Sequence, residues 1–427
     1  MAKRWFLLSF VFLFALCAIG PVLAGDSDGI QQTAASGMNI ILQKNQSEVA
    51  QIVLLLRAGS GLEPQGKKGI AQIMNNIVYW ILQSNSKDSI GSMDVQTSPD
   101  YSVINITTLA RNIKPVLGKI KFLLSEPIYS YDDVANLQKY ACSRIKSRMG
   151  MVQPYIEFNK AFYGESHPYN DWPNPKTLES ITGADVYRWY RQTYQPGNAI
   201  LSLSGKIPQN IGDLEKYFSD MRSETVDHRM FVSPVNLTAN RSIEQEDKNS
   251  KAASICIGFA APRILDPDYP VFKLITFYLA DYFEYFNELR LKHGLFYSPV
   301  VFSDEFEKPS APHLVLISVT DPAHVEAVEA ETVKLMTKLM EKGIEQEEIA
   351  KILAAMKAAD DAKSASGENT AFLNAFSYYM RTQLVYNQVL WPKLQQIKTE
   401  DIKRVACKYL KNYIQVVYSP KHIAADL

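Results

Sequence analysis

The chain has 427 residues, which is too long for one ordinary domain and fits two or three. Hydrophobic residues make up 47% of it and charged residues 21%, so it can bury real cores and is not disordered. Lys and Arg together number 45, as do Asp and Glu together, and this balance argues against a nucleic-acid-binding protein.

Residues 1–24 are predicted to be a signal peptide and no part of the fold. Lys3 and Arg4 give a positive start, an apolar stretch follows, and Val22 and Ala24 supply the small residues that a signal peptidase needs. The stretch is too short to span a bilayer comfortably, and no later apolar run reaches that length. We therefore expect a secreted, periplasmic protein whose mature chain has no integral membrane segment.

Cleavage of the leader removes Cys17 and leaves Cys142, Cys256 and Cys407. A lipid anchor at Cys17 is disfavoured because the residues before it are bulky. An exported protein stabilised by disulfides normally has more cysteines and an even number of them. We expect the remaining three to be mostly small buried apolar residues.

The next elements form a pattern that the chain repeats. An apolar strand begins at Ile52, Leu62-Glu63-Pro64 follows, and an apolar helix starts near Gly69. The same succession recurs 203 residues later, with a strand at Ile255, Leu265-Asp266-Pro267 and a helix from about Val271. This repeat indicates an internal duplication.

Two further blocks match in the same order. Helices open at Asp132 and, 215 residues later, at Glu347. The segment from Ile181 corresponds to the segment from Ile397 at an offset of 216, and each leads to a final strand, 199–203 or 413–418. Acidic residues lie in the first turns of these helices, where the helix dipole favours them.

The duplication predicts an α+β protein of two homologous domains, each an antiparallel-rich sheet with helices packed on one face. We expect the first domain at residues 25–221 and the second at 252–427. The polar stretch 222–251 has no helical apolar period, so it is predicted to be a linker.

Taken together, these motifs resemble the insulinase/pitrilysin superfamily, the inverted-zinc-motif peptidases, over nearly the whole mature chain. In that family the helix after Leu-Glu-Pro carries Gly-x-Ala-His-x-x-Glu-His, and here the corresponding stretch is 69–76. A second segment, 287–297, is similar to the family's Leu-Arg-x-x-x-Gly-Leu-x-Tyr. Further markers that resemble the family lie at 167–169, 177–182, 194–198 and Gly205.

The resemblance also implies that this chain does not bind zinc. The family needs two imidazoles on one helix face, a carboxylate beside them and a later Glu, but the motif positions here are Gln72, Asn75 and Asn76. Carboxamides cannot replace imidazole in a tight zinc site, and Asn75 cannot act as a general base. No Glu lies between Glu126 and Glu157 to supply the third ligand. We expect no cofactor in this chain and interpret the three as polar residues on a helix that faces a cavity.

The second domain retains an Arg and a Tyr that resemble the substrate-binding pair of the family. Arg290 and Tyr297 match the family's pair in spacing, and the resemblance implies that they bind substrate backbone and support the oxyanion at a zinc site across the chamber. We expect a helix over 272–290 that ends near Gly294 and a strand over 296–301. The alternative is that Arg290 only complements a helix C-terminus and Tyr297 only packs in a sheet.

Family members work as a clamshell of four such domains, so two domains imply a second chain. We expect a non-catalytic subunit of a heteromeric zinc metallopeptidase, which closes the chamber and offers Arg290 and Tyr297 to a homologous, zinc-bearing partner that acts on peptides. The alternative is a peptide-binding or structural scaffold protein with no peptidase partner. No Ser/His/Asp or Cys/His arrangement supports a metal-independent hydrolase.

Overall fold

The structure is a computed structural model that describes residues 30–83, 89–125, 130–170, 172–207, 214–221, 223, 232–280, 287–296, 299–365, 369–381 and 386–420. The predicted leader, 1–24, lies outside these residues. No helix in the described ranges is long and apolar enough to cross a membrane.

The first half of the chain is built on a six-stranded sheet in the order β1-β2-β6-β3-β5-β4. The pair β2 and β6 is parallel and the other neighbours are antiparallel. Its strands are β1 (Ile30–Ala35), β2 (Met38–Lys44), β3 (Val49–Leu56), β4 (Ser92–Thr97), β5 (Ser102–Leu109) and β6 (Ala199–Gly205).

The second half repeats this design in a five-stranded sheet of order β7-β11-β8-β10-β9. Again one pair, β7 and β11, is parallel and the rest are antiparallel. Its strands are β7 (Arg241–Glu246), β8 (Ala253–Ala260), β9 (Val300–Ser303), β10 (His313–Thr320) and β11 (Ile414–Ser419). The two sheets therefore share topology, and the predicted duplication into two homologous α+β domains is confirmed.

Helices of each half cover the outer face of its own sheet. In the first half these are α1 (Ile70–Gln83), α2 (Ile113–Ser125), α4 (Pro175–Ser180), α5 (Gly183–Thr193) and α6 (Leu214–Phe218). In the second half they are α7 (Tyr269–Ala280), α9 (Val325–Glu341), α12 (Tyr386–Leu394) and α13 (Thr399–Tyr409). Alternate strand residues such as Ile52 and Leu54 are fully buried beneath them, as period-2 patterning requires.

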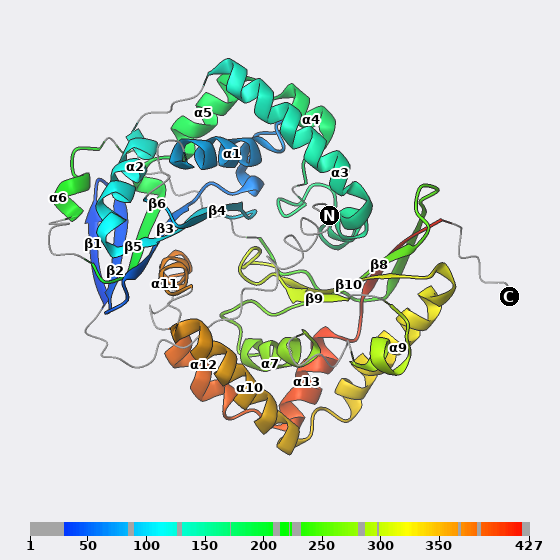
Figure 1. Ribbon diagram of the computed structural model, residues 1–427. Helices are drawn as coiled ribbons and strands as arrows, with labels where there is room; N and C mark the ends of the chain where they lie inside the picture. The colour runs from blue at the N-terminus through cyan, green and yellow to red at the C-terminus, as the bar shows by residue number, and fades with distance from the viewer. Residues whose placement is uncertain are drawn as a thin grey trace, which may run out of the picture.

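The inner face of each sheet is covered by a helix from the other half. The end of α3 (Tyr131–Tyr163) packs on β8 and β11, whereas α11 (Thr370–Tyr379), which follows α10 (Gln346–Ala365), packs on β6 and β3. The offset of 215 residues that relates Asp132 to Glu347 also relates α3 to α10 and α11 together. The two halves thus exchange equivalent helices, and Figure 1 shows α11 (orange) beside the strands of the first sheet.

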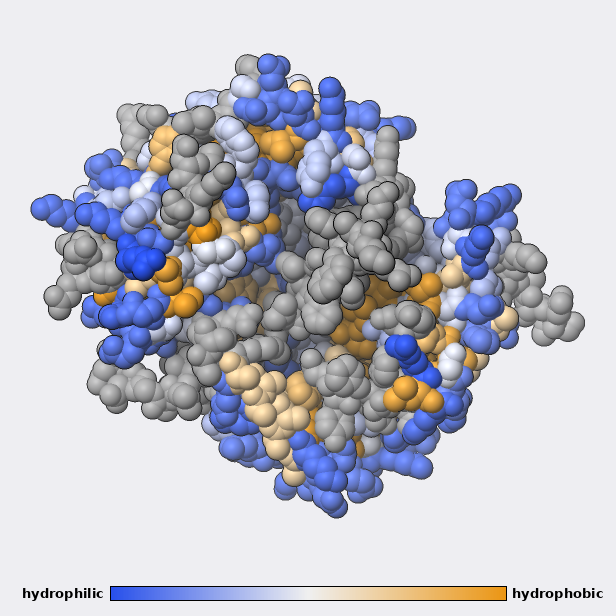
Figure 2. Space-filling view, in the orientation of Figure 1, coloured by the Kyte–Doolittle hydropathy of each residue, from blue (hydrophilic) through white to orange (hydrophobic). Residues whose placement is uncertain are grey.

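Polar contacts fix this exchange. Asn374 on α11 donates to Gln43 (2.7 Å), and the Tyr378 hydroxyl donates to Asn39 (2.6 Å). In the other direction, the Tyr163 hydroxyl at the end of α3 donates to the carbonyl of Ala311 (2.8 Å). Figure 2 shows that hydrophilic residues dominate the rim of the visible face, while hydrophobic residues gather nearer the middle of the view.

Several expected elements differ from those observed. The hairpin of β1 and β2 was not expected; its turn uses Ser36 and Gly37, both at positive φ. The strand β7 lies inside the predicted linker. Its polar sequence does not indicate a strand, but pairing with β11 supplies hydrogen-bond partners for its backbone. The strand expected from residue 296 begins at Val300. Of the helix expected over 272–290, α7 and a π-helical turn, η6 (Asn287–Lys292), are seen, and 281–286 lie outside the described residues.

Candidate functional site

The helix that carries the degenerate motif is held at its start by Glu63. Its buried carboxylate accepts hydrogen bonds from the backbone N–H groups of Gly69 (3.0 Å) and Ala71 (2.9 Å), which satisfies donors that a helix N-terminus leaves open. Gly69 has φ +103°, and a Cβ there would overlap Leu178. The Glu of the Leu-Glu-Pro motif therefore has a structural role, because it fixes the start of α1. The sequence showed the motif but not the role of Glu63.

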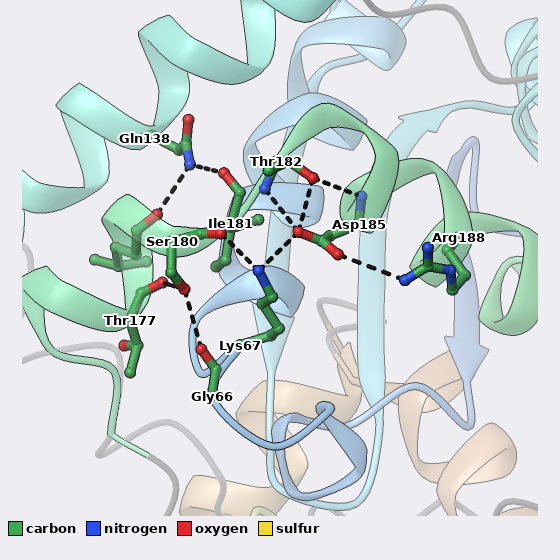
Figure 3. Close-up of polar contacts among 10 residues, drawn as sticks. Gly66, Lys67, Gln138, Thr177, Ser180, Ile181, Thr182, Asp185 and Arg188 are labelled. Atoms are coloured by element: carbon green, nitrogen blue, oxygen red, sulfur yellow. Dashed lines mark hydrogen bonds and ion pairs between the residues drawn. The ribbon is translucent and has the colours of Figure 1, made fainter.

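The loop before α1 is also tied to the start of α5. Lys67 forms an ion pair with Asp185 (2.9 Å) and donates to the carbonyl of Ser180 (2.6 Å), as Figure 3 shows. Asp185 forms a capping box with Thr182. Burial acts to raise the pKa of Asp185, but hydrogen bonds from Lys67 and Thr182 outweigh it and lower this pKa to about 2. The loop that leads into the motif helix is therefore held by an ion pair and a hydrogen bond.

The three motif residues do not form a metal site. Asn75 is buried and donates to Thr97 Oγ1, while the Tyr194 hydroxyl donates to its Oδ1 (3.3 Å). The half-buried Asn76 donates to the carbonyl of Gln72, one turn back (2.8 Å). Because the Asn75 amide is used inside the protein, these residues do not fit zinc. In the described ranges, no group of three or more His, Cys, Asp or Glu side chains could hold a metal ion.

This geometry refines the expectation of polar residues facing a cavity. Asn75 faces a polar cluster of the buried Ser102 and Tyr194 and the half-buried Thr97, and the Thr97 and Ser102 hydroxyls are 3.1 Å apart. Burial raises the pKa of Tyr194, so this hydroxyl stays protonated. The role of Asn75 is to hold strand β4 to α1.

The expectation for the cysteines is correct for one residue and wrong for another. Cys256 is fully buried on β8, and burial raises the pKa of its thiol. Cys142 is half-buried on α3, and Cys407 is exposed on α13 because it lies on the outer side of that surface helix.

Arg290 lies in η6, the π-helical turn that packs on α9, and is half-buried. Its helix ends as expected: Gly294 has φ +65°, its N–H donates to the Arg290 carbonyl (2.9 Å), and the Leu295 N–H donates to the Leu289 carbonyl (2.9 Å). Tyr297 lies outside the described residues, so the meeting of the Arg/Tyr pair stays a prediction.

Comparison with known proteins shows which proteins this chain is similar to. The family model described as "Peptidase M16 inactive domain" matches residues 180–356. The chain is 22% identical over 406 residues to the zinc protease PqqE of Helicobacter pylori, covering 89% of this chain and 90% of that protein. It is 20% identical over 206 residues to the mitochondrial-processing peptidase subunit alpha-1 of Dictyostelium discoideum, covering 44% and 31%.

Solved structures share the fold over nearly the whole chain. A protease from Helicobacter pylori superposes with a TM-score of 0.82 at 19% identity, covering 92% of this chain and 99% of that one. A peptidase M16 inactive domain from Pseudomonas fluorescens gives 0.75 at 15%, covering 92% and 98%. The periplasmic protease PqqL from Escherichia coli gives 0.69 at 15%, where this chain covers 48% of that chain. The chain is thus similar to insulinase-type (M16) peptidases over nearly its whole length, and the match over residues 180–356 supports a non-catalytic protein of that kind.

Proposed function

We propose that this chain is the non-catalytic subunit of a heteromeric zinc peptidase of the secretory or periplasmic space. The observation that carries the proposal is the motif helix, which is intact while its metal-binding positions hold Gln72, Asn75 and Asn76. A subunit that only closes the chamber needs this helix to keep its shape. It does not need the zinc ligands that the helix carries in active peptidases.

The relatives support a partner-dependent role. One is named as a subunit of a processing peptidase, and PqqL, called a periplasmic protease, is about twice as long as this chain. We infer that a homologous chain with the zinc motif supplies the other pair of domains and the zinc. In this arrangement Arg290 and Tyr297 reach the partner's site and bind the backbone of a peptide.

Localisation and domain limits belong to the same proposal. The leader 1–24 directs export, residues 25–221 and 252–427 form the two peptidase-like domains, and 222–251 joins them. The second candidate function is a peptide-binding or structural scaffold with no peptidase partner. The solved complex III2 from Candida albicans contains a chain of the same fold, with a TM-score of 0.72 at 14% identity.

The test begins with isolation of the partner from native extract and reconstitution of the pair. Zinc-dependent peptide cleavage should appear only when both chains are mixed. The Arg290→Ala and Tyr297→Phe variants should lower kcat/KM about tenfold or more, because each removes a donor to the reacting carbonyl. Lys292→Ala is the matched control, since it removes a charge two residues away. Unchanged cleavage in both variants would remove the role given to the pair, and cleavage by the isolated chain would reject the proposal.

A further inference from the structure

The turn that carries Arg290 is a short element held from several sides. It is a single π-helical turn, a rare conformation that is frequent at functional sites. Leu289 is fully buried and Leu295, just beyond the turn, is also buried, whereas Leu291 is 68% exposed. Thr320 on β10 donates a hydrogen bond to the carbonyl of Leu295. Apolar packing therefore holds the inner side of the turn, and its outer side depends on other contacts.

His293 supplies one of these contacts, and it lies where the turn closes. The Gly294 N–H donates to the carbonyl of Arg290 (2.9 Å), so His293 lies between two residues whose backbones are hydrogen-bonded. The Nε2 atom of His293 is 3.6 Å from Oε2 of Glu331 on α9, the helix against which η6 packs. A stronger contact between His293 and Glu331 therefore holds the backbone of Arg290 more firmly against α9.

The strength of this contact depends on pH. Histidine is the side chain whose charge ordinarily changes between about pH 5 and 8, and the side chains of His293 and Glu331 are both partly exposed. Lys334, on the next turn of α9, lies 3.1 Å from the same oxygen of Glu331 and competes for it. On the turn itself, Arg290 and Lys292 add positive charge at the end of the helix, where the helix dipole favours it. A neutral His293 leaves Glu331 to Lys334, whereas a protonated His293 shares the carboxylate.

We propose that His293 and Glu331 are positioning residues for Arg290, and that they hold its turn against α9 when His293 is protonated. Between pH 8 and pH 6 the imidazole gains charge, its attraction to the carboxylate grows, and Arg290 is placed more firmly. This inference rests on the proposed function, in which Arg290 binds the peptide backbone, and it adds a regulation of that role by mild acidity.

The first test uses the full mature chain without a partner, so it does not depend on cleavage. Hydrogen–deuterium exchange with mass spectrometry measures the protection of the backbone amides in 287–296, corrected for the intrinsic exchange rate at each pH. In the wild type, protection should be about threefold higher at pH 6 than at pH 8, as a partly exposed ion pair predicts. The His293→Gln and Glu331→Gln variants should both lose this difference.

His324→Gln is the matched control, because it removes another exposed histidine beside α9, and it should keep the difference. Lys334→Gln should enlarge the difference, since Glu331 then loses the lysine that competes with His293. Equal wild-type protection at the two pH values, or an undiminished difference in His293→Gln, would overturn the inference.

The second test uses the pair reconstituted with the partner. The ratio of kcat/KM of the wild type to that of His293→Gln should rise about threefold as the pH falls from 8 to 6. The rise should vanish when both proteins also carry Arg290→Ala, and a rise that persists without Arg290 would overturn the positioning role. Absence of zinc-dependent cleavage would reject the proposed function, while the exchange experiment would still decide whether His293 holds the turn.

Discussion

At the scale of single residues, the buried contacts between the halves centre on His313. The Tyr163 hydroxyl donates to Ala311, so its oxygen accepts from His313 Nδ1 (2.9 Å). His313 Nε2 is then left as the acceptor for the Tyr155 hydroxyl (3.2 Å). The network therefore assigns a neutral imidazole, which is fully buried.

Burial and Lys308 favour the same neutral state and outweigh the Asp304 carboxylate, which lies 3.3 Å from His313 Nε2. Lys308 lies 3.3 Å from Asp304 and donates to Asn159 (2.5 Å), and both ionic side chains are almost completely buried. Burial and the nearby Lys308 lower the pKa of His313 well below its usual value. For Asp304, burial raises the pKa to about 6, although Lys308 opposes this.

These two shifts have opposite effects on stability. Below about pH 6.5 the unfolded chain protonates His313 and the folded chain does not, so the His313 contribution to stability is lost as the pH falls. Asp304 takes up its proton more readily in the folded state, so its contribution rises as the pH falls through about 6.

The variant His313→Gln isolates the histidine contribution, because glutamine can still donate to Tyr163 and accept from Tyr155. Between pH 7 and pH 5, the wild type should lose stability relative to this variant by up to about 1.4 kcal/mol per pH unit. The measurement is denaturant unfolding at several pH values. The same pH dependence in both proteins would show that His313 does not titrate in this way.

Asn75 supports a second expectation at this scale. Asn75→Ala should lower the free energy of unfolding by about 1–3 kcal/mol, because Tyr194 and Thr97 lose a buried partner. Asn76→Ala is the control and should change it by no more than about 0.5 kcal/mol, since among the described residues Asn76 bonds within its own helix. Equal losses in chemical denaturation would contradict the structural role given to Asn75.

The sequence alone located the motif residues but not their surroundings. Gln72, Asn75 and Asn76 could be placed from their spacing after Gly69, because helix periodicity is local. The partner of Asn75 on β4 could not be placed in this way, and neither could the pairing of β9 with β10. Strand pairing joins residues that lie far apart in the chain. The pairing of β4 with β5 was not predicted for this reason, although the alternation of polar and apolar residues in 92–97 was a usable signal.

At the scale of elements, the contact of α3 with the second sheet depends on Gly258. A Cβ at this position would overlap the ring of Phe158, so only glycine allows the helix to approach β8 so closely. The duplicated blocks predicted that α3 and its counterpart exist, because capping residues and apolar periods are local signals. They did not predict the exchange between halves, which depends on the shape of two folded sheets.

Gly258→Ala should therefore destabilise the protein by about 1–3 kcal/mol through overpacking. The control is Gly118→Ala on α2, where the nearest atom to a Cβ is the Tyr217 hydroxyl at 3.6 Å, and this variant should be neutral or stabilising. Combined with Phe158→Leu, the Gly258→Ala cost should shrink, which a double-mutant cycle in urea would measure. Additive effects of the two substitutions would show that the cost of Gly258→Ala does not come from contact with Phe158.

At the scale of the whole molecule, the exchanged helices make the halves depend on each other. A fragment 25–221 would leave the inner face of its sheet without α11, and a fragment 222–427 would lack α3. Each bared face includes fully buried side chains such as Ile200 and Val416.

We expect the separate fragments to aggregate or unfold and the co-expressed fragments to associate into one particle. Size-exclusion chromatography with thermal unfolding of each sample checks this. Two fragments that each remain monomeric and unfold cooperatively at the temperature of the intact chain would show that the exchanged helices contribute little.

The exchange also bears on how such a chain arose. A lone half with this design could close its inner face by exchanging the equivalent helix with an identical copy, which is the geometry of a symmetric pair of short chains. Fusion of two such genes would leave each copy free to diverge. One copy could then keep apolar residues on its sheet at Val300 and Phe302. The other could carry Asp94 and Gln96 at the equivalent positions without a change in the shared architecture.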